Sequence, residues 1–217
     1  MFAFSDLRVA TYCPRKLYYA RQGERSPPES VARVRALAFR YPTLLEADDE
    51  MLGELPVELP PQEYRERLRE TRDWCDRFDD LCDPDRREVL LTGREVRGVV
   101  HKVLTGPPEP SLVSPGKPPE NGVWEPHSVW AVAAAKALAW EEQVPVERAF
   151  VEYPAYGVIR SVDVTGRRKA AYRRAMRTVA AIDGPPPRLR NRSKCGSCEY
   201  ASDCGVRTRS LRTLLGL

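Results

Sequence analysis

The stretch KCGSCEYASDCG, residues 194–205, places three cysteines close together in the sequence. Cys195 and Cys198 are separated by two residues, a spacing that lets two thiolates turn onto one metal centre. Cys204 follows six positions later and supplies a third thiolate. Structural zinc sites and iron–sulfur cubanes both take four such ligands, so this stretch predicts a metal centre that needs one more cysteine.

A lone cysteine near residue 1 is the natural fourth ligand. Cys13 lies in the stretch TYCPRKLYY, residues 11–19. Pro14 interrupts the helix expected over residues 6–22, so the Cys13 side chain can leave the helix face. The other two cysteines, Cys75 and Cys82, are expected to be small buried side chains in a helical segment. Zinc and an iron–sulfur cluster both remain open as occupants.

The composition is typical of a soluble globular protein. Of 217 residues, 42% are hydrophobic and 30% are charged. No apolar run approaches the roughly 20 residues of a membrane helix, and residues 1–6 lack the basic and apolar regions of a signal peptide. We therefore expect a cytoplasmic protein with no membrane partner, in which a reducing environment favours metal ligation over disulfides.

The net charge of +4 is unevenly distributed along the chain. Residues 46–90 carry 7 Lys and Arg against 16 Asp and Glu, whereas residues 165–217 carry 13 against 3. If the cysteines bring the two ends together, positive charge gathers on one side of the molecule and suits a polyanion such as DNA. An ordinary solvated surface is the alternative interpretation.

The pattern between the cysteines predicts helices first and strands second. The expected order is helices over 6–22 and 29–39, acidic helices within 44–90, strands over 89–91 and 96–104, a loop over 107–122 with at most one short strand, a helix over 128–143, a hairpin of 149–153 and 157–164, and a basic helix over 165–182. This order favours an α/β core in which helices flank a mixed sheet.

Residues 12–19 and the spacing of Cys195, Cys198 and Cys204 together resemble the CRISPR-associated Cas-four family. That family belongs to the RecB-like and Dna-two-like nucleases of the PD-(D/E)xK class. The resemblance extends from about Phe4 to Gly205 and implies a restriction-endonuclease-like core in a single domain, residues 1–217. It also implies that Cys13 and the three tail cysteines hold a [4Fe–4S] cluster. The implied parts are N-terminal helices (1–43), an acidic helical insert (44–90), the nuclease-like core (91–182) and a basic cysteine tail (183–217).

The resemblance also implies a metal-dependent nuclease centre, but its motif residues are altered. His101 ends the stretch GVVH, residues 98–101, where the family has an aspartate. Pro115 stands where a second carboxylate is expected, two residues before Lys117. His101 and Lys117 are the remaining catalytic candidates, with Mg²⁺ or Mn²⁺ as the metal if the site is active. Four acidic residues near the expected strands are candidates for displaced ligands: Glu95, Glu120, Glu125 and Asp163.

These observations favour a DNA-binding iron–sulfur protein without the standard metal–carboxylate centre. The partner is single-stranded DNA or duplex ends, with CRISPR adaptation proteins as further candidates. One alternative is an active metal-dependent exonuclease on single-stranded DNA, in CRISPR adaptation or DNA repair. Another is a structural or redox-responsive interaction protein. The predicted DNA contacts are Arg15, Lys16, Arg167, Arg168, Lys169, Arg173, Arg174, Arg188, Arg190, Arg192 and Lys194.

Overall fold

The computed structural model describes residues 1–23, 28–189 and 191–205. Its helices follow the expected order closely. They are α1 (Phe4–Tyr12), α2 (Pro14–Ala20), α3 (Glu29–Leu37), α4 (Tyr41–Glu46), α5 (Asp49–Glu54), α6 (Pro61–Trp74), α7 (Phe78–Cys82), α8 (Glu125–Glu142), α9 (Gly166–Ala180) and α10 (Arg192–Gly196), with a short 3₁₀ turn η1 (Pro154–Tyr156).

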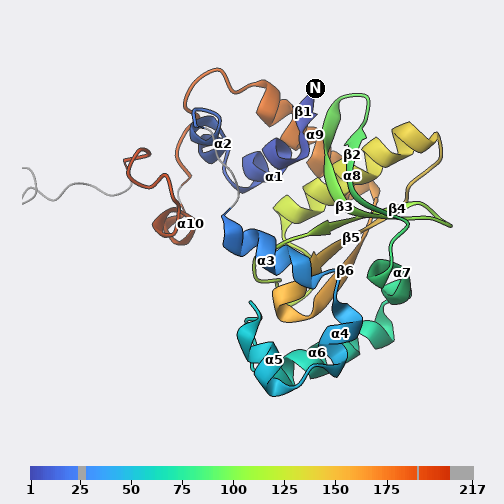
Figure 1. The fold of residues 1–217 in the computed structure, drawn as a ribbon. Helices are drawn as coiled ribbons and strands as arrows, with labels where there is room; N and C mark the ends of the chain where they lie inside the picture. Colours follow the sequence, from blue (N-terminus) through green and yellow to red (C-terminus); the bar gives the residue numbers. More distant parts are fainter. Residues whose placement is uncertain (24–27, 190, 206–217) are drawn as a thin grey trace, which may run out of the picture.

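A mixed sheet of six strands forms the centre of the molecule (Figure 1). Its strands are β1 (Phe2–Ala3), β2 (Arg86–Thr92), β3 (Val96–Leu104), β4 (Glu109–Val113), β5 (Arg148–Tyr153) and β6 (Val158–Asp163). Strands β2, β3 and β4 form an antiparallel meander, β5 pairs parallel to β4, and β6 pairs antiparallel to β5. The parallel step requires a crossover, which α8 supplies. The predicted α/β core with a mixed sheet flanked by helices is thus confirmed.

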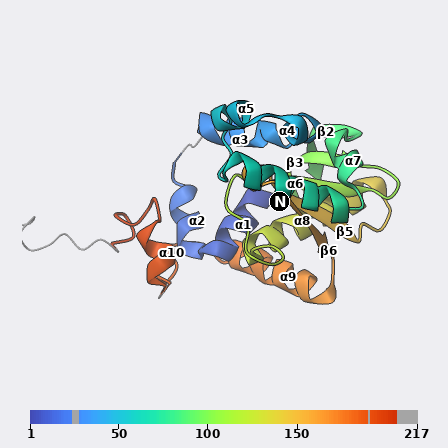
Figure 2. The same ribbon diagram turned by 90° about the horizontal axis from the view of Figure 1, so that it is seen from below.

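The sheet is covered on both faces, as Figure 2 shows. Helices α3 to α7, which include the acidic segment, lie on one face, and α1, α8 and α9 lie on the other. Side chains alternate between these layers along each strand. On β4, for example, Leu112 belongs to the core under α8, whereas its neighbour Val113 belongs to the core under the α3–α7 layer. No helix in the described ranges combines the length and apolarity that a membrane span needs.

The helix expected over residues 6–22 is divided at Cys13. This residue has an extended backbone, with φ −162° and ψ 115°, and Pro14 occupies the first turn of α2. Proline is tolerated there because the first amides of a helix have no intrahelical partner. The expected break is therefore confirmed, and it directs the Cys13 side chain away from the faces of both helices.

Three boundaries differ from the sequence-based expectation. Strand β1 was not expected, because its two residues are too few for a periodic pattern and owe their pairing to the distant β3. Strand β2 begins at Arg86 rather than Val89, since Arg86 pairs with Val103. Helix α8 begins at Glu125, three residues early, with Pro126 in its first turn.

A fully buried ion pair joins the α3–α7 layer to the sheet. Lys102 on β3 and Glu152 on β5 are both 0% exposed, and the Lys102 Nζ donates a hydrogen bond of 2.8 Å to Glu152. The same Nζ donates to the carbonyl oxygens of Ala38, after α3, and Leu81, in α7, at 2.6 and 2.7 Å. Ser111 on β4 donates to the other Glu152 oxygen at 2.5 Å. All three ammonium protons are therefore used, as a buried charge requires.

Replacing Lys102 by methionine is expected to lower the free energy of unfolding by about 3–5 kcal/mol, because Glu152 then remains as a buried charge without a cation. The double variant Lys102→Met/Glu152→Gln removes that charge and is expected to recover much of the loss. Urea unfolding followed by circular dichroism measures both. Equal losses in the single and double variants would contradict a dominant role for the ion pair.

Candidate functional site

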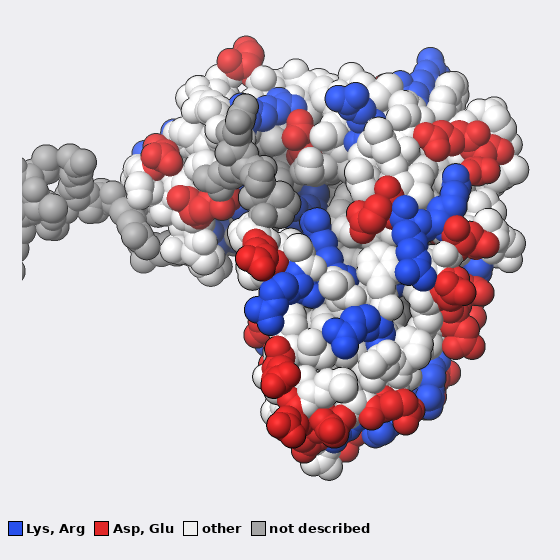
Figure 3. Space-filling view, viewed as in Figure 1, with Lys and Arg blue, Asp and Glu red and all other residues white. Residues whose placement is uncertain are grey.

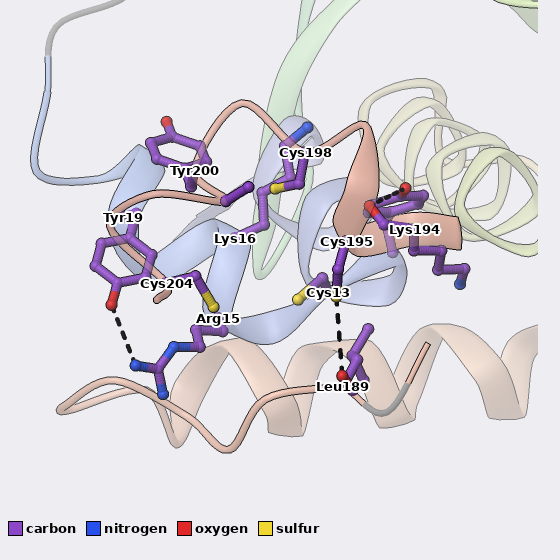
Figure 4. Close-up of a pocket in the computed structure, with 12 residues that line it drawn as sticks. Cys13, Arg15, Lys16, Tyr19, Leu189, Lys194, Cys195, Cys198, Tyr200 and Cys204 are labelled. Carbon is purple, nitrogen blue, oxygen red and sulfur yellow. Dashed lines mark hydrogen bonds between the residues drawn. The ribbon is translucent and has the colours of Figure 1, made fainter. Parts of the chain in front are cut away.

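The four cysteines predicted as ligands line one cavity. Cys13 comes from the junction of α1 and α2, Cys195 from α10, and Cys198 and Cys204 from the turns that follow it. Figure 4 shows their sulfur atoms arranged around a common space between the N-terminal helices and the tail. Figures 1 and 2 both show α2 and α10 side by side, although about 170 residues of sequence separate them. Cys75 and Cys82 do not line this cavity.

Side chains of α1 and α2 hold the tail against the N-terminal helices. The Tyr12 hydroxyl donates to the Lys194 carbonyl oxygen at 3.4 Å, and the Tyr19 hydroxyl donates to that of Asp203 at 3.1 Å. Arg15 donates to the Pro186 carbonyl oxygen at 2.8 Å, and Lys16 lies 3.2 Å from the Glu199 carboxylate. These contacts join the two ends of the described chain through ordinary hydrogen bonds and one ion pair.

Positive side chains surround the four thiols. Arg15, Lys16 and Lys194 line the same cavity as the cysteines. Burial raises the pKa of the neighbouring Tyr12 hydroxyl, and negative charge on the cysteine sulfurs raises it further. The Cys195 Sγ donates to the Leu189 carbonyl oxygen at 3.8 Å. Within the described residues, no group of three or more His, Cys, Asp or Glu is spaced to hold a metal ion.

A second and larger cavity adjoins the cysteine cavity. It has a volume of about 660 Å³, and Tyr12, Lys16 and Lys194 line both cavities. Residues 114–117, which follow β4, and the start of α8 form its other walls. Four cations line it, and no Asp or Glu of the described chain does. We call it the cationic cleft; its cations are Arg8, Lys16, Lys117 and Lys194.

The space-filling view agrees with this distribution of charge. Figure 3 shows Lys and Arg side chains in the hollow between the body of the molecule and the smaller lobe that carries the tail. Acidic side chains gather instead at the opposite end of the same view, over α4, α5 and α6. The acidic insert and the cleft are therefore on different parts of the surface, which leaves the cleft positively charged.

His101, one of the two catalytic candidates, is enclosed in the core. It is 3% exposed and does not line the cleft. Its Nδ1 accepts a hydrogen bond of 3.0 Å from the Val113 backbone, which places the ring proton on Nε2. Burial, followed by the positive charges of Arg35, Lys102 and Arg8, lowers the pKa of His101 to about 3. The imidazole is therefore neutral at physiological pH.

The other candidate, Lys117, does line the cleft, but carboxylates do not accompany it. Glu125 lies 3.4 Å from Arg174, Asp163 ends β6, and Glu95 precedes β3. Neither these residues nor Glu120 contribute to the cleft wall. Without carboxylate ligands beside Lys117, the cleft lacks the oxygen donors that hard divalent cations prefer.

Sequence reasoning missed His127, which lines the cleft at the start of α8. Its Nδ1 lies 2.8 Å from the Tyr153 hydroxyl, which also takes a backbone hydrogen bond from Trp124. Burial, followed by the charge of Arg8, lowers the pKa of His127 to about 4. Trp124, Tyr12 and Arg8 are further cleft residues not expected as site residues. Tyr12 belongs to the stretch around Cys13 that the sequence analysis quoted. The sequence pattern offered no signal for His127, Trp124 or Arg8.

The predicted DNA contacts fall into separate groups. Lys16 and Lys194 line the cleft, whereas Arg15 and Arg188 bind carbonyl oxygens of the chain itself. The predicted residues of α9 lie outside the cleft; they are Arg167, Arg168, Lys169, Arg173 and Arg174. Arg190 and the side chain of Arg192 lie outside the described part of the structure.

Comparisons with known proteins do not identify the chain. No protein-family model matches it, and neither does any curated protein. Among solved structures, it is similar to the protein described as "Crystal structure of SSO0001", with 11% sequence identity and a TM-score of 0.37, over 91% of this chain and 94% of that one. A likeness of this degree identifies neither a family nor an activity.

The low pKa of His101 predicts a specific loss of stability in acid. Below about pH 6.5 the unfolded chain gains a proton at His101, while the folded chain does not until about pH 3, so the free energy of unfolding falls as pH falls. His101→Asn keeps an acceptor for the Val113 amide but cannot titrate. Between pH 6 and pH 4.5 its unfolding free energy is expected to fall less steeply, by about 1.4 kcal/mol per pH unit. Urea denaturation at several pH values measures this, and identical slopes would contradict it.

Proposed function

We propose that this chain is a DNA-binding iron–sulfur protein, built like the Cas-four and RecB-like nucleases but without their metal–carboxylate centre. The cationic cleft is the observation that carries the proposal, because four cations and no described carboxylate line it. Such a surface attracts the phosphates of a nucleic acid. It repels the divalent cations that the family's usual chemistry needs.

The sheet supports the proposed nuclease-like architecture in its order of strands. An antiparallel meander, β2 to β4, is followed by the crossover helix α8 and the parallel strand β5. The cleft lies where the loop after β4 meets the start of α8. This arrangement agrees with the restriction-endonuclease-like core implied by the sequence resemblance. Of the altered motif residues, Pro115 and Lys117 line the cleft, whereas His101 does not.

The donor set around the cysteine cavity fits an iron–sulfur cluster. Four cysteines from both ends of the described chain line one space, and four thiolates are the usual ligands of a [4Fe–4S] cluster. Arg15, Lys16 and Lys194 would balance the negative charge of a thiolate-ligated cluster. Four thiolates suit a zinc ion as well, so zinc is the alternative occupant. We propose the cluster because the spacing of the four cysteines resembles that of the Cas-four family.

The cluster is tested by its iron content and colour. Protein purified without oxygen is expected to contain about four iron atoms per chain, with visible absorbance that dithionite bleaches. Cys198→Ser is expected to lose most of the iron, because one of four ligands is removed. Cys75→Ser, a buried cysteine outside the cavity, is the matched control and should keep it. Colourless protein with one zinc per chain would refute the cluster.

DNA binding is tested by the dependence of affinity on salt. If the four cleft cations contact phosphates, the affinity for a single-stranded oligonucleotide should fall with a log–log slope of about −3. Fluorescence anisotropy measures the slope. Lys117→Gln should weaken binding and reduce the slope by about 0.7, whereas Arg69→Gln, at an exposed position of α6 outside the cleft, should change neither.

The same samples distinguish binding from hydrolysis. End-labelled single-stranded DNA is expected to stay intact in Mg²⁺ or Mn²⁺, because the cleft has no described carboxylate to hold either ion. Metal-dependent cleavage that Lys117→Ala abolishes would instead establish the active exonuclease. Absence of binding to any oligonucleotide would refute the proposed DNA-binding function.

A further inference from the structure

Three of the four cleft cations form no ion pair within the described residues. Lys16 has Glu199 as an ion-pair partner. The Lys194 Nζ lies 4.9 Å from the centre of the Tyr12 ring, a contact that leaves its positive charge in place. Arg8 forms no ion pair within the described ranges, and its Nε is buried without a hydrogen-bond acceptor there. Lys117 is exposed, lines the same cleft and likewise has no described ion pair. The cleft therefore holds cations that lack an anion.

Arg8 differs from Lys117 because the protein partly encloses it. Its guanidinium lies 5.0 Å from the centre of the Trp130 ring. Burial, followed by the charge of the nearby Arg35, lowers the pKa of Arg8. No carboxylate of the described chain forms an ion pair with Arg8, so a bound anion would offset both effects.

His127 adds a neutral hydrogen-bond donor to the same wall. Its Nδ1 is occupied by the Tyr153 hydroxyl at 2.8 Å. Which of the two groups donates depends on the imidazole tautomer. In the tautomer with its proton on Nε2, the neutral imidazole can donate to an oxygen anion.

The size of the cleft and an exposed aromatic ring suggest what carries the anion. A volume of about 660 Å³ is within the usual range of small-molecule sites, roughly 300–1,000 Å³, which suits a nucleotide rather than a duplex. Trp124 is 50% exposed, and its indole nitrogen donates to the Lys117 carbonyl oxygen at 2.8 Å. The ring is thus fixed beside Lys117 with a face available for stacking on a base.

We propose that the cationic cleft binds the terminal phosphate of single-stranded DNA, with Arg8 and Lys117 holding the phosphate and Trp124 stacking on the terminal base. A terminal phosphomonoester carries nearly two negative charges at neutral pH, whereas an internal phosphodiester carries one. Cations without an ion pair, Arg8 and Lys117 among them, favour the more highly charged terminal group. This assignment rests on the proposed DNA-binding function and adds to it the part of the DNA that is recognised.

The test compares three oligonucleotides of about 12 nucleotides with one sequence and an internal fluorophore. One carries a 5′-phosphate, one a 3′-phosphate, and one hydroxyl groups at both ends. Anisotropy titrations use the iron-loaded protein in the presence of a chelator for divalent cations. One of the two phosphorylated oligonucleotides is expected to bind about tenfold more tightly than the hydroxyl form, and the end that is preferred assigns the polarity.

Single substitutions test which residues are responsible for the preference for a terminal phosphate. Arg8→Gln and Lys117→Gln are each expected to reduce it to about threefold or less, while Arg69→Gln, at an exposed position of α6 outside the cleft, keeps it. Lys117 is exposed, so its replacement leaves the core unchanged even if Arg8→Gln fails to fold. Trp124→Ala should weaken binding of an oligonucleotide with a normal terminal base but not of one whose phosphorylated terminal nucleotide is abasic.

The outcomes separate this inference from the function on which it rests. Equal affinity of the wild-type protein for all three oligonucleotides would overturn terminal-phosphate recognition and leave DNA binding in place. A preference that Lys117→Gln does not change would also overturn it, because the phosphate would then lie elsewhere. Failure to bind any of the three would refute DNA binding itself.

Discussion

The buried pair of Lys102 and Glu152 is the constraint on which the arrangement of layers depends. Two charges without access to water must find each other and exhaust their remaining hydrogen bonds within the protein. Lys102 does so by binding Glu152 and the carbonyl oxygens of residues 38 and 81, so that β3, β5 and the α3–α7 layer meet at one nitrogen atom. The acidic insert is therefore part of the core rather than an appendage.

Successive side chains of β3 point to opposite faces of the sheet, and the two faces differ in how their charged groups are paired. Lys102 faces the α3–α7 layer and is fully paired, whereas its neighbour His101 faces α8 and packs beside Trp130. On that second face the Arg8 Nε of α1 is buried without a described acceptor. The charge of Lys102 is thus neutralised inside the fold, whereas Arg8 keeps its positive charge beside the cleft.

Local patterns predicted the elements well because each depends on neighbours in sequence. The break at Cys13 follows from Pro14, and the run of alanines in α8 predicts a helix wherever it lies. Other features depend on distant contacts and had no local signal. A lysine in a β-branched strand does not reveal which face it takes, so Lys102 was not distinguished from a surface residue. Likewise, Arg8 and His127 become site residues only because α1 and the start of α8 meet at one cavity.

The cysteine cavity and the cationic cleft are physically linked by a common wall. Tyr12, Lys16 and Lys194 line both cavities, and the ammonium groups of Lys16 and Lys194 lie 5.6 and 4.9 Å from the centre of the Tyr12 ring. Any movement of the tail displaces Lys194 and so changes the cleft. The hydrogen bonds of Tyr12, Arg15 and Tyr19 to tail carbonyl oxygens therefore do more than join the two ends: they set the position of one of the four cations. A cluster bound by the four cysteines would fix that position further, and would so connect the proposed metal centre to the proposed DNA-binding cleft.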